Sequence, residues 1–250
     1  MRPRTRLAAL VESYFVGATP RTGSSLLLGL LDSTGVCGHP QAYFRAPDEA
    51  SWAARWSLSP TAGHRAFVAA AMRAGRTPNG VFGAKLMWGT HAELVAKLAP
   101  ARSGDDLAVL REAFGVIRFV CLRRDDVLAQ AVSWVRAEQT GRWFDGGHGE
   151  ISGAGPAAEP VFDAAAITRT MRTIEEHNAG WEAWFARYRV EPLRVRYEDL
   201  AADPTGTTRR VLHFLGVAAP GRIVAHHRRQ ADELNREWIR RYQAAAIAGS

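Results

Sequence analysis

A run of six residues near the N-terminus joins a cation, a glycine and several hydroxyl groups: Pro20-Arg21-Thr22-Gly23-Ser24-Ser25. The guanidinium of Arg21 is planar and permanently charged, which suits phosphate or sulfate oxygens. Gly23 lets the backbone approach a ligand closely, and the serine hydroxyls can cap a helix or donate to anion oxygens. This combination predicts an anion site, because a helix beginning here would add unpaired N–H groups and a positive N-terminal charge.

The elements that must position this loop are visible on both of its sides. The apolar run Tyr14–Ala18 predicts a buried strand before it, and a leucine-rich pattern predicts a helix over Ser24–Ser33 after it. The loop departs from the signature of nucleotide triphosphatases, which needs four residues between two glycines and then a lysine. Five residues separate Gly17 from Gly23, and Ser24 stands where that lysine would be. A kinase-like phosphotransferase therefore stays an alternative that lacks its phosphate-binding lysine, and a strand-to-helix turn without a ligand is the other.

A second strand-to-helix junction also carries groups that bind phosphate. The apolar run Val116–Leu122 predicts a buried strand, and Arg124 follows it just before a predicted helix, Val127–Glu138. An arginine at such a junction can hold a phosphate, and Ser133 on the helix could join it. The alternative is that Arg124 pairs with a neighbouring aspartate on a solvated turn.

Both loops together resemble the sulfotransferase superfamily, and a third block strengthens the likeness: VRYEDL at Val195–Leu200, followed by FLGV at Phe214–Val217. Four further segments are similar to the actinobacterial trehalose 2-sulfotransferase family: GVCGHPQAYF (Gly35–Phe44), RTPNGVFGAKLMW (Arg76–Trp88), GWEAWF (Gly180–Phe185) and RQADELNREWIRRY (Arg229–Tyr242). The resemblance covers nearly the whole chain, apart from the N-terminal arm and the loop at residues 141–160.

This resemblance implies an enzyme that moves a sulfuryl group in line from 3′-phosphoadenosine 5′-phosphosulfate (PAPS) to a hydroxyl of a carbohydrate or glycosylated small molecule, without a metal. The run that begins at Pro20 would hold the 5′-phosphosulfate, while Arg124 and Ser133 would hold the 3′-phosphate. Arg21 and Lys85 are the cations expected at the reacting sulfate or the acceptor; the alternative for Lys85 is a surface lysine at a strand end. The resemblance also implies a homodimer, formed through exposed aromatic helices such as Gly180–Phe185.

Ala42 is the position at which the chain departs from this family. The family carries a glutamate there, expected to be the general base that takes the proton from the acceptor hydroxyl, and a methyl group cannot do so. Three explanations stay open. The base has been removed, His39 three positions earlier replaces it, or the chain is a non-catalytic homologue that binds the nucleotide and transfers poorly.

The acceptor side would be shaped by residues 35–60 and 141–160, which differ visibly from the trehalose pattern. Four residues are expected to bind the substrate: Gln41, Tyr43, Phe44 and Trp88. The aromatic rings of Tyr43, Phe44 and Trp88 would stack on a sugar ring, or these residues are simply buried in the core. A sugar, a glycolipid precursor and a glycosylated natural product are the candidate acceptors.

The overall composition bounds the class of protein. The chain has 250 residues, of which 47% are hydrophobic, and this suits a single domain over residues 1–250. Its net charge of +7 fits an anionic ligand. Nucleic acid is a distant alternative, because the arginines are mixed with acids rather than gathered in a basic block. Two isolated cysteines, a short N-terminal apolar run and the lack of a membrane-length segment indicate a cytoplasmic protein with neither a metal site nor a membrane span.

Strands alternate with helices along the chain. Further strands are predicted at Val81–Trp88 and Leu193–Tyr197, and further helices at Thr61–Gly75, His91–Leu98, Leu107–Phe114, Asp163–Tyr188, Thr205–Leu215 and Ala225–Ile247. This order predicts a P-loop-like α/β fold with a mostly parallel central sheet and helices on both faces. Residues 1–13 are expected to form an N-terminal arm, and residues 141–160 a mobile loop.

Overall fold

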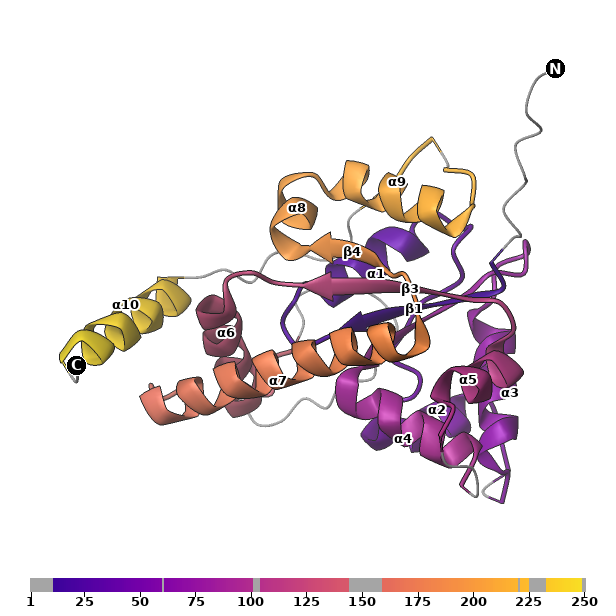
Figure 1. The fold of residues 1–250 in the computed structure, drawn as a ribbon, viewed down its shortest axis with the longest axis horizontal. Helices are drawn as coiled ribbons and strands as arrows, with labels where there is room; N and C mark the ends of the chain where they lie inside the picture. The colour runs from indigo at the N-terminus through magenta and orange to yellow at the C-terminus, as the bar shows by residue number, and fades with distance from the viewer. Residues whose placement is uncertain are drawn as a thin grey trace.

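Figure 1 shows a sheet with helices around it, in a computed structural model that describes residues 11–59, 61–100, 104–143, 159–219, 221–224 and 233–248. The strands are β1 (Ser13–Ala18), β2 (Phe82–Met87), β3 (Ile117–Arg123) and β4 (Leu193–Arg196). The helices are α1 (Ser24–Asp32), α2 (Ala46–Arg55), α3 (His64–Gly75), α4 (Trp88–Leu98), α5 (Asp106–Phe114), α6 (Val127–Thr140), α7 (Ala164–Tyr188), α8 (Tyr197–Ala202), α9 (Pro204–Leu215) and α10 (Glu233–Ala248). None of these helices is long and apolar enough to cross a membrane.

The described strands form one parallel sheet in the order β2-β1-β3-β4. In the register of β1, Ala18 is paired with Met87 of β2 and Gly17 with Cys121 of β3. The loops that leave these three strands therefore start at the same sheet edge, which is where parallel α/β sheets bind their ligands. The prediction of a mostly parallel α/β sheet is confirmed.

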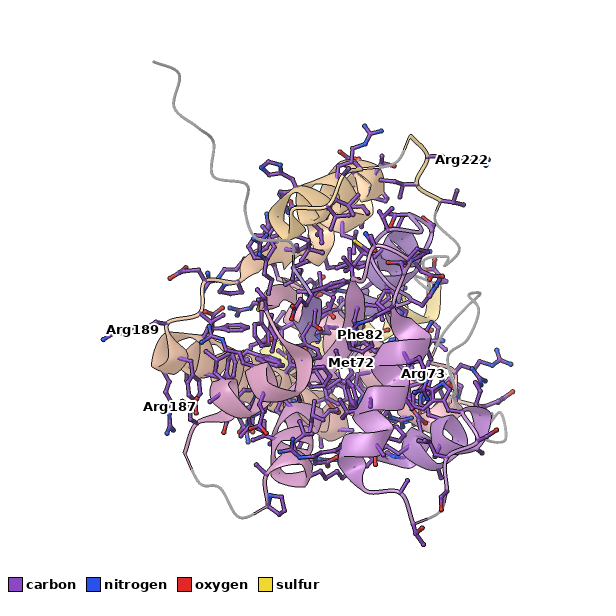
Figure 2. All side chains as sticks on the ribbon, turned by 90° about the vertical axis from the view of Figure 1, so that its right-hand side faces the viewer. Met72, Arg73, Phe82, Arg187, Arg189 and Arg222 are labelled. Carbon is purple, nitrogen blue, oxygen red and sulfur yellow. The ribbon has the colours of Figure 1, made fainter. Side chains whose placement is uncertain are left out.

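Strand side chains alternate between two cores, one on each face of the sheet. Tyr14 and Val16 of β1 belong to the core that includes α1 and α9. Phe15 belongs to the opposite core, which includes residues of α3, α4, α5 and α7. Figure 2 shows Phe82 of this second core inside the molecule, whereas Arg187 at the end of α7 extends outward. The prediction of helices on both faces is confirmed.

Each of these two cores holds one cysteine. Cys37, in the loop after α1, lies in the core of α1 and α9, and Cys121 of β3 lies in the opposite core. Both thiols are free and buried. Burial raises the pKa of Cys37 to about 12 and that of Cys121 to about 11, because the thiolate would lose its hydration. Cys121 therefore packs as a small hydrophobic residue of the core.

Two helices were not expected from the sequence. α2 begins directly after a loop rich in glycine and proline, and Pro47 occupies its first turn, where a missing N–H breaks no helical hydrogen bond. α8 begins at Tyr197, the residue at which a predicted strand was expected to end. Much of the predicted arm, residues 144–158 of the predicted mobile loop and the start of the predicted C-terminal helix lie outside the described residues.

The aromatic segment Gly180–Phe185 of α7 is buried. Trp181, Trp184 and Phe185 are each at most 5% exposed and belong to the core shared with α4 and α5. Their spacing of three and four residues makes one stripe along the helix, which is the pattern of a face turned to the core. The prediction that this segment offers an exposed dimer surface is wrong.

Candidate anion-binding site

The loop between β1 and α1 turns sharply within five residues. Arg21 and Gly23 both have positive φ, 65° and 79°, and the hydroxyl of Thr22 donates to the carbonyl of Thr19 over 2.9 Å. α1 begins at Ser24 with Gly23 as its N-cap, so no capping side chain bonds to its first amides. Ser24 and Ser25 lie in the first turn of the helix rather than at the cap. The N–H groups of this turn and the helix dipole favour an anion here.

Any other residue at position 23 would suffer both a steric clash and an unfavourable backbone conformation. A Cβ there would lie 2.6 Å from a ring carbon of Tyr197, and a φ of 79° is costly for residues with a side chain. We expect Gly23→Ala to lower the free energy of unfolding by about 3 kcal/mol, measured by urea denaturation.

Gly35→Ala is the matched control for this substitution. Gly35 also has a positive φ, 65°, but nothing lies within 4 Å of the Cβ it would gain. Its replacement should therefore carry only the conformational cost, about 1 kcal/mol. Equal losses of stability in the two variants would show that the contact between Gly23 and Tyr197 has no energetic weight.

Helix α6 holds the anion loop from the side. Nε2 of Gln130 donates to Oγ1 of Thr19 over 2.8 Å and to the carbonyl of Pro20 over 2.7 Å. About one turn further along α6, Oγ of Ser133 accepts from Nε of Arg21 over 2.9 Å. The structure therefore brings together Arg21 and Ser133, which the sequence analysis placed in two separate phosphate-binding segments.

Sequence reasoning missed Gln130. Its side chain is fully buried, in a run of buried α6 residues that includes Ala129, Ala131 and Val132. A fully buried amide needs hydrogen-bond partners, so a glutamine within this apolar run was the available signal. Its partners lie far away in the sequence, and only the fold identifies them.

Positive charge gathers at this site. The guanidinium of Arg124, on the loop between β3 and α6, lies 4.7 Å from the ring centre of Tyr197. Burial, followed by repulsion from Arg124 and Arg136, lowers the pKa of Arg21 to about 10. Arg21 stays protonated at neutral pH, and the repulsion among these guanidinium groups would be relieved by a ligand with more than one negative charge. The site thus fits a polyanion.

Lys85 is buried within the sheet. It is paired with Val16 of β1, and its backbone N–H donates to the carbonyl of Gln41 over 2.9 Å. The alternative of a surface lysine at a strand end is wrong. A buried ammonium group loses hydration, and nearby negative charge compensates that loss, so this position suits a lysine beside an anion.

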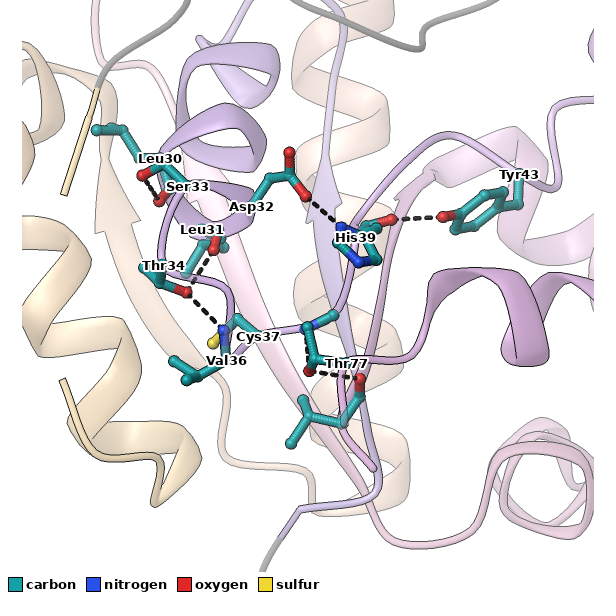
Figure 3. Close-up of polar contacts among 12 residues, drawn as sticks. Leu30, Leu31, Asp32, Ser33, Thr34, Val36, Cys37, His39, Tyr43 and Thr77 are labelled. Carbon is teal, nitrogen blue, oxygen red and sulfur yellow. Dashed lines mark hydrogen bonds and ion pairs between the residues drawn. The ribbon is translucent and has the colours of Figure 1, made fainter. Parts of the chain in front are cut away.

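The structure does not bring His39 to the anion loop. Nδ1 of His39 is 2.7 Å from Oδ1 of Asp32, as Figure 3 shows, and its backbone N–H donates to the carbonyl of Gly75. Asp32 is the last residue of α1, and Ser24 is the first. These two ends are separated by about 12 Å along the helix axis. This placement argues against His39 as the replacement for the missing base.

Ala42 follows His39 in the loop between α1 and α2. This part of the loop runs toward the sheet edge at which β1, β2 and β3 end. Gln41 forms a parallel bridge with Ala84 of β2, so the chain here runs in the direction of the strands. Gln41 and Ala42 are both half-buried, and neither is sealed in the core. Both positions remain candidates for contact with a ligand.

Tyr43 and Phe44 are core residues, 3% and 1% exposed. The ring of Tyr43 lies 5.0 Å from that of Trp52 and 5.7 Å from that of Phe82, and Phe44 lies 5.6 Å from Phe114, measured between ring centres. Other side chains therefore cover the rings that were expected to stack on a sugar. The alternative that Tyr43 and Phe44 are buried is confirmed, and their contact with a substrate stays a prediction.

Trp88 is half-buried at the start of α4, directly after β2. Its ring lies 5.3 Å from that of Trp181 in an edge-on arrangement and stacks on the imidazole of His91 at 5.7 Å. One part of Trp88 therefore belongs to the core. The remainder stays a candidate for the wall of a binding site.

The imidazole of His91 on α4 is enclosed by Trp88, Trp181 and Trp184. Burial lowers the pKa of His91 to about 4. In the unfolded chain this imidazole takes up a proton as the pH falls below about 6.5, while in the folded protein it stays neutral. Stability is therefore lost as the pH falls from that value, and His91 should account for about 2 kcal/mol of the loss at about pH 5.

Replacement of His91 by glutamine tests this pH dependence. The free energy of unfolding should fall less between neutral pH and about pH 5 in His91→Gln than in the unchanged protein, by about 2 kcal/mol. Urea denaturation at the two pH values measures the difference. Burial also lowers the pKa values of His64 and His177, but both proteins contain them, so their effect cancels. The same pH dependence in both proteins would contradict the role of His91.

Comparisons with known proteins agree with these motifs. A family model described as Stf0 sulphotransferase matches residues 13–245. The chain is 36% identical over 268 residues to a trehalose 2-sulfotransferase of Mycobacterium tuberculosis (strain ATCC 35801 / TMC 107 / Erdman), covering 96% of this chain and 97% of the relative. It is 34% identical over 271 residues to a trehalose 2-sulfotransferase of Mycolicibacterium smegmatis, covering 94% and 95%.

Two solved structures of sulfotransferases are also similar to this chain. A crystal structure of a sulfotransferase from Alicyclobacillus acidocaldarius matches with a TM-score of 0.49 and 15% identity, covering 96% of this chain and 94% of that one. The sulfotransferase domain of the Synechococcus PCC 7002 olefin synthase matches with a TM-score of 0.44 and 17% identity, covering 88% and 78%.

Proposed function

The chain belongs to the Stf0 sulphotransferase family, and we propose that it transfers a sulfuryl group from PAPS to a hydroxyl of a carbohydrate. Two relatives with at least 34% identity over nearly the whole chain are trehalose 2-sulfotransferases, which supports a sugar or a glycosylated small molecule as the acceptor. A phosphotransferase is disfavoured by this family membership and by the missing phosphate-binding lysine.

The observation that carries this proposal is the meeting of two arginines and a helix N-terminus at one edge of the sheet. Arg21 is bonded to Ser133 over 2.9 Å, and Arg124 is close enough to lower the pKa of Arg21. Gly23 is the N-cap of α1 and offers no capping side chain. A nucleotide phosphorylated at both its 3′ and 5′ positions carries the several negative charges that such a site fits.

Each end of the donor has its own set of residues in this proposal. The run from Pro20 to Ser25 holds the 5′-phosphosulfate, and Arg124 together with Ser133 holds the 3′-phosphate. The donor supplies an activated sulfuryl group. Arg21 and the first amides of α1 stabilise the charge that develops on the leaving phosphate, and Lys85 supplies a further cation near the transferring group. These groups provide the positive charge without a metal ion.

The acceptor side is assigned to residues that the core does not enclose. Gln41, Ala42 and Trp88 are half-buried and belong to segments at or next to β2. Tyr43 and Phe44 are buried and anchor this segment in the core. A glutamate at position 42, which the family resemblance implies, would be held on an anchored backbone, and Ala42 leaves this chain without that carboxylate.

Titration calorimetry with adenosine 3′,5′-bisphosphate, the product of the proposed transfer, tests the donor assignment. ADP is the control, because it also carries two phosphates but has none at the 3′ position. Tight binding of the bisphosphate and weak binding of ADP would support the proposed donor. Equal binding of the two, or no binding of either, would overturn it. Binding of ATP with Mg²⁺ and transfer of its phosphate would support a phosphotransferase instead.

We also propose that the protein is a homodimer and that it acts in the cytoplasm. The family resemblance suggests the dimer, and two buried free thiols suit a reducing compartment. The dimer surface lies elsewhere than on the buried stripe of Trp181, Trp184 and Phe185. Light scattering coupled to gel filtration should give twice the mass of the 27.4 kDa chain, and a monomer mass would contradict the dimer.

A further inference from the structure

The loop that carries Arg124 is held by the junction of β4 and α8, which Figure 1 places beside the end of β3. Nε of Arg196 donates to Oδ2 of Asp125 over 2.7 Å. The carboxylate of Glu198 accepts from the backbone N–H of Asp125 over 3.2 Å. Between these two residues, Tyr197 places its ring 4.7 Å from the guanidinium of Arg124. Three successive residues thus contact the same short loop.

Tyr197 also touches the anion loop itself. Two of its ring carbons would lie 2.6 and 3.0 Å from a Cβ on Gly23, so the ring sits directly against the backbone there. The same ring therefore contacts both the backbone at the start of α1 and the guanidinium of Arg124. Its position fixes how the two anion-binding groups lie relative to each other.

We propose that Tyr197 is a positioning residue that holds Arg124 where it recognises a 3′-phosphate, and so sets the preference for 3′-phosphorylated nucleotides. This inference rests on the proposed function and goes beyond it, since it assigns the selectivity to a residue outside the two phosphate-binding segments. An arginine side chain has many rotamers, and an aromatic face that attracts the cation reduces them before the ligand arrives.

The test compares two nucleotides that differ only in the 3′-phosphate: adenosine 3′,5′-bisphosphate and adenosine 5′-monophosphate. Their Kd values are measured by calorimetry for the unchanged protein, Tyr197→Phe and Tyr197→Leu. Loss of the aromatic face in Tyr197→Leu should reduce the ratio of the two affinities about tenfold, with little change for the monophosphate. Tyr197→Phe keeps the aromatic face and should keep the ratio.

Arg124→Met completes a double-mutant cycle. If Tyr197 acts through Arg124, adding Tyr197→Leu to Arg124→Met should not reduce the affinity ratio any further. A merely structural role of Tyr197 would weaken both nucleotides equally, and that result would overturn the inference. A ratio that falls in Tyr197→Phe as much as in Tyr197→Leu would overturn it as well, because the hydroxyl and not the ring face would then be responsible.

Failure of this inference can be told apart from failure of the proposed function. An affinity ratio that is as large in Tyr197→Leu as in the unchanged protein overturns only the role of Tyr197. No preference in the unchanged protein overturns the proposed donor and this inference together. Circular dichroism checks that each variant is folded, and Tyr197→Met, which also lacks an aromatic face, takes the place of Tyr197→Leu if that variant does not fold.

Discussion

The Ala42→Glu variant should transfer sulfate to a carbohydrate acceptor about 10²- to 10⁴-fold faster than the present chain, which is the range that a positioned general base contributes. The family resemblance implies a glutamate at this position, and the half-buried Ala42 lies on a backbone that is bridged to β2 next to Lys85. A carboxylate here would accept the proton of the acceptor hydroxyl. Turnover with PAPS and trehalose, followed as formation of the bisphosphate, measures the gain.

Ala42→Gln is the matched control, because glutamine has nearly the shape of glutamate but no basic oxygen at neutral pH. A gain in Ala42→Gln equal to that in Ala42→Glu would show that size and not basicity matters. If the present chain already turns over as fast as Ala42→Glu, another group is the base. If neither protein turns over any sugar while both bind the bisphosphate, the chain is a non-catalytic nucleotide-binding homologue.

The second large effect is expected from Gln130→Met. The substitution keeps length and burial but removes the two hydrogen bonds, 2.8 and 2.7 Å long, that hold Thr19 and Pro20. It leaves Oγ1 of the fully buried Thr19, as well as the carbonyl of the half-buried Pro20, without this donor, so the free energy of unfolding should fall by about 2–4 kcal/mol. Affinity for adenosine 3′,5′-bisphosphate should fall at least about tenfold, because the loop that positions Arg21 is released.

Gln139→Met on the same helix is its control. Gln139 also makes two hydrogen bonds, both to the backbone of Val161 at 2.8 and 3.0 Å, but it is only half-buried, so water can replace them. Its replacement should change the stability by less than about 1 kcal/mol and leave the nucleotide affinity unchanged. Urea denaturation and calorimetry measure both quantities. Similar losses in the two variants would mean that the contacts of Gln130 to the loop have no special weight.

Local patterns were sufficient for the strands and most of the helices. The run Tyr14–Ala18 and the leucines after Ser24 carry their periodicity within a few residues, so β1, the loop and α1 could be predicted directly. The stripe on α7 was misjudged, although the spacing of Trp181, Trp184 and Phe185 is itself typical of a buried face. α2 was hidden because glycines and prolines before it favoured a loop, while Pro47 in fact suits a first helical turn.

The site depended more on tertiary contacts. Arg21 could be predicted as an anion-binding residue from its loop alone, whereas the role of Arg124 could be predicted only with the family resemblance. The partners of Gln130 and Tyr197 lie far away in the sequence, and no local pattern encodes such a pairing. The burial of Tyr43 could not be decided from the sequence for a related reason, because an aromatic residue next to a binding segment has the same local pattern whether it faces a ligand or the core.

The labelling rate of each cysteine can report how often its own face of the sheet opens. Cys37 and Cys121 are buried in opposite cores, and burial suppresses the reactive thiolate of both. A thiol reagent can therefore modify each one only when its side of the molecule opens. In Cys121→Ser the labelling rate reports the layer of α1 and α9, and in Cys37→Ser it reports the layer of α4, α5 and α7. Equal rates would mean that the two layers come apart in one cooperative event, and unequal rates would rank the layers by their local opening free energy.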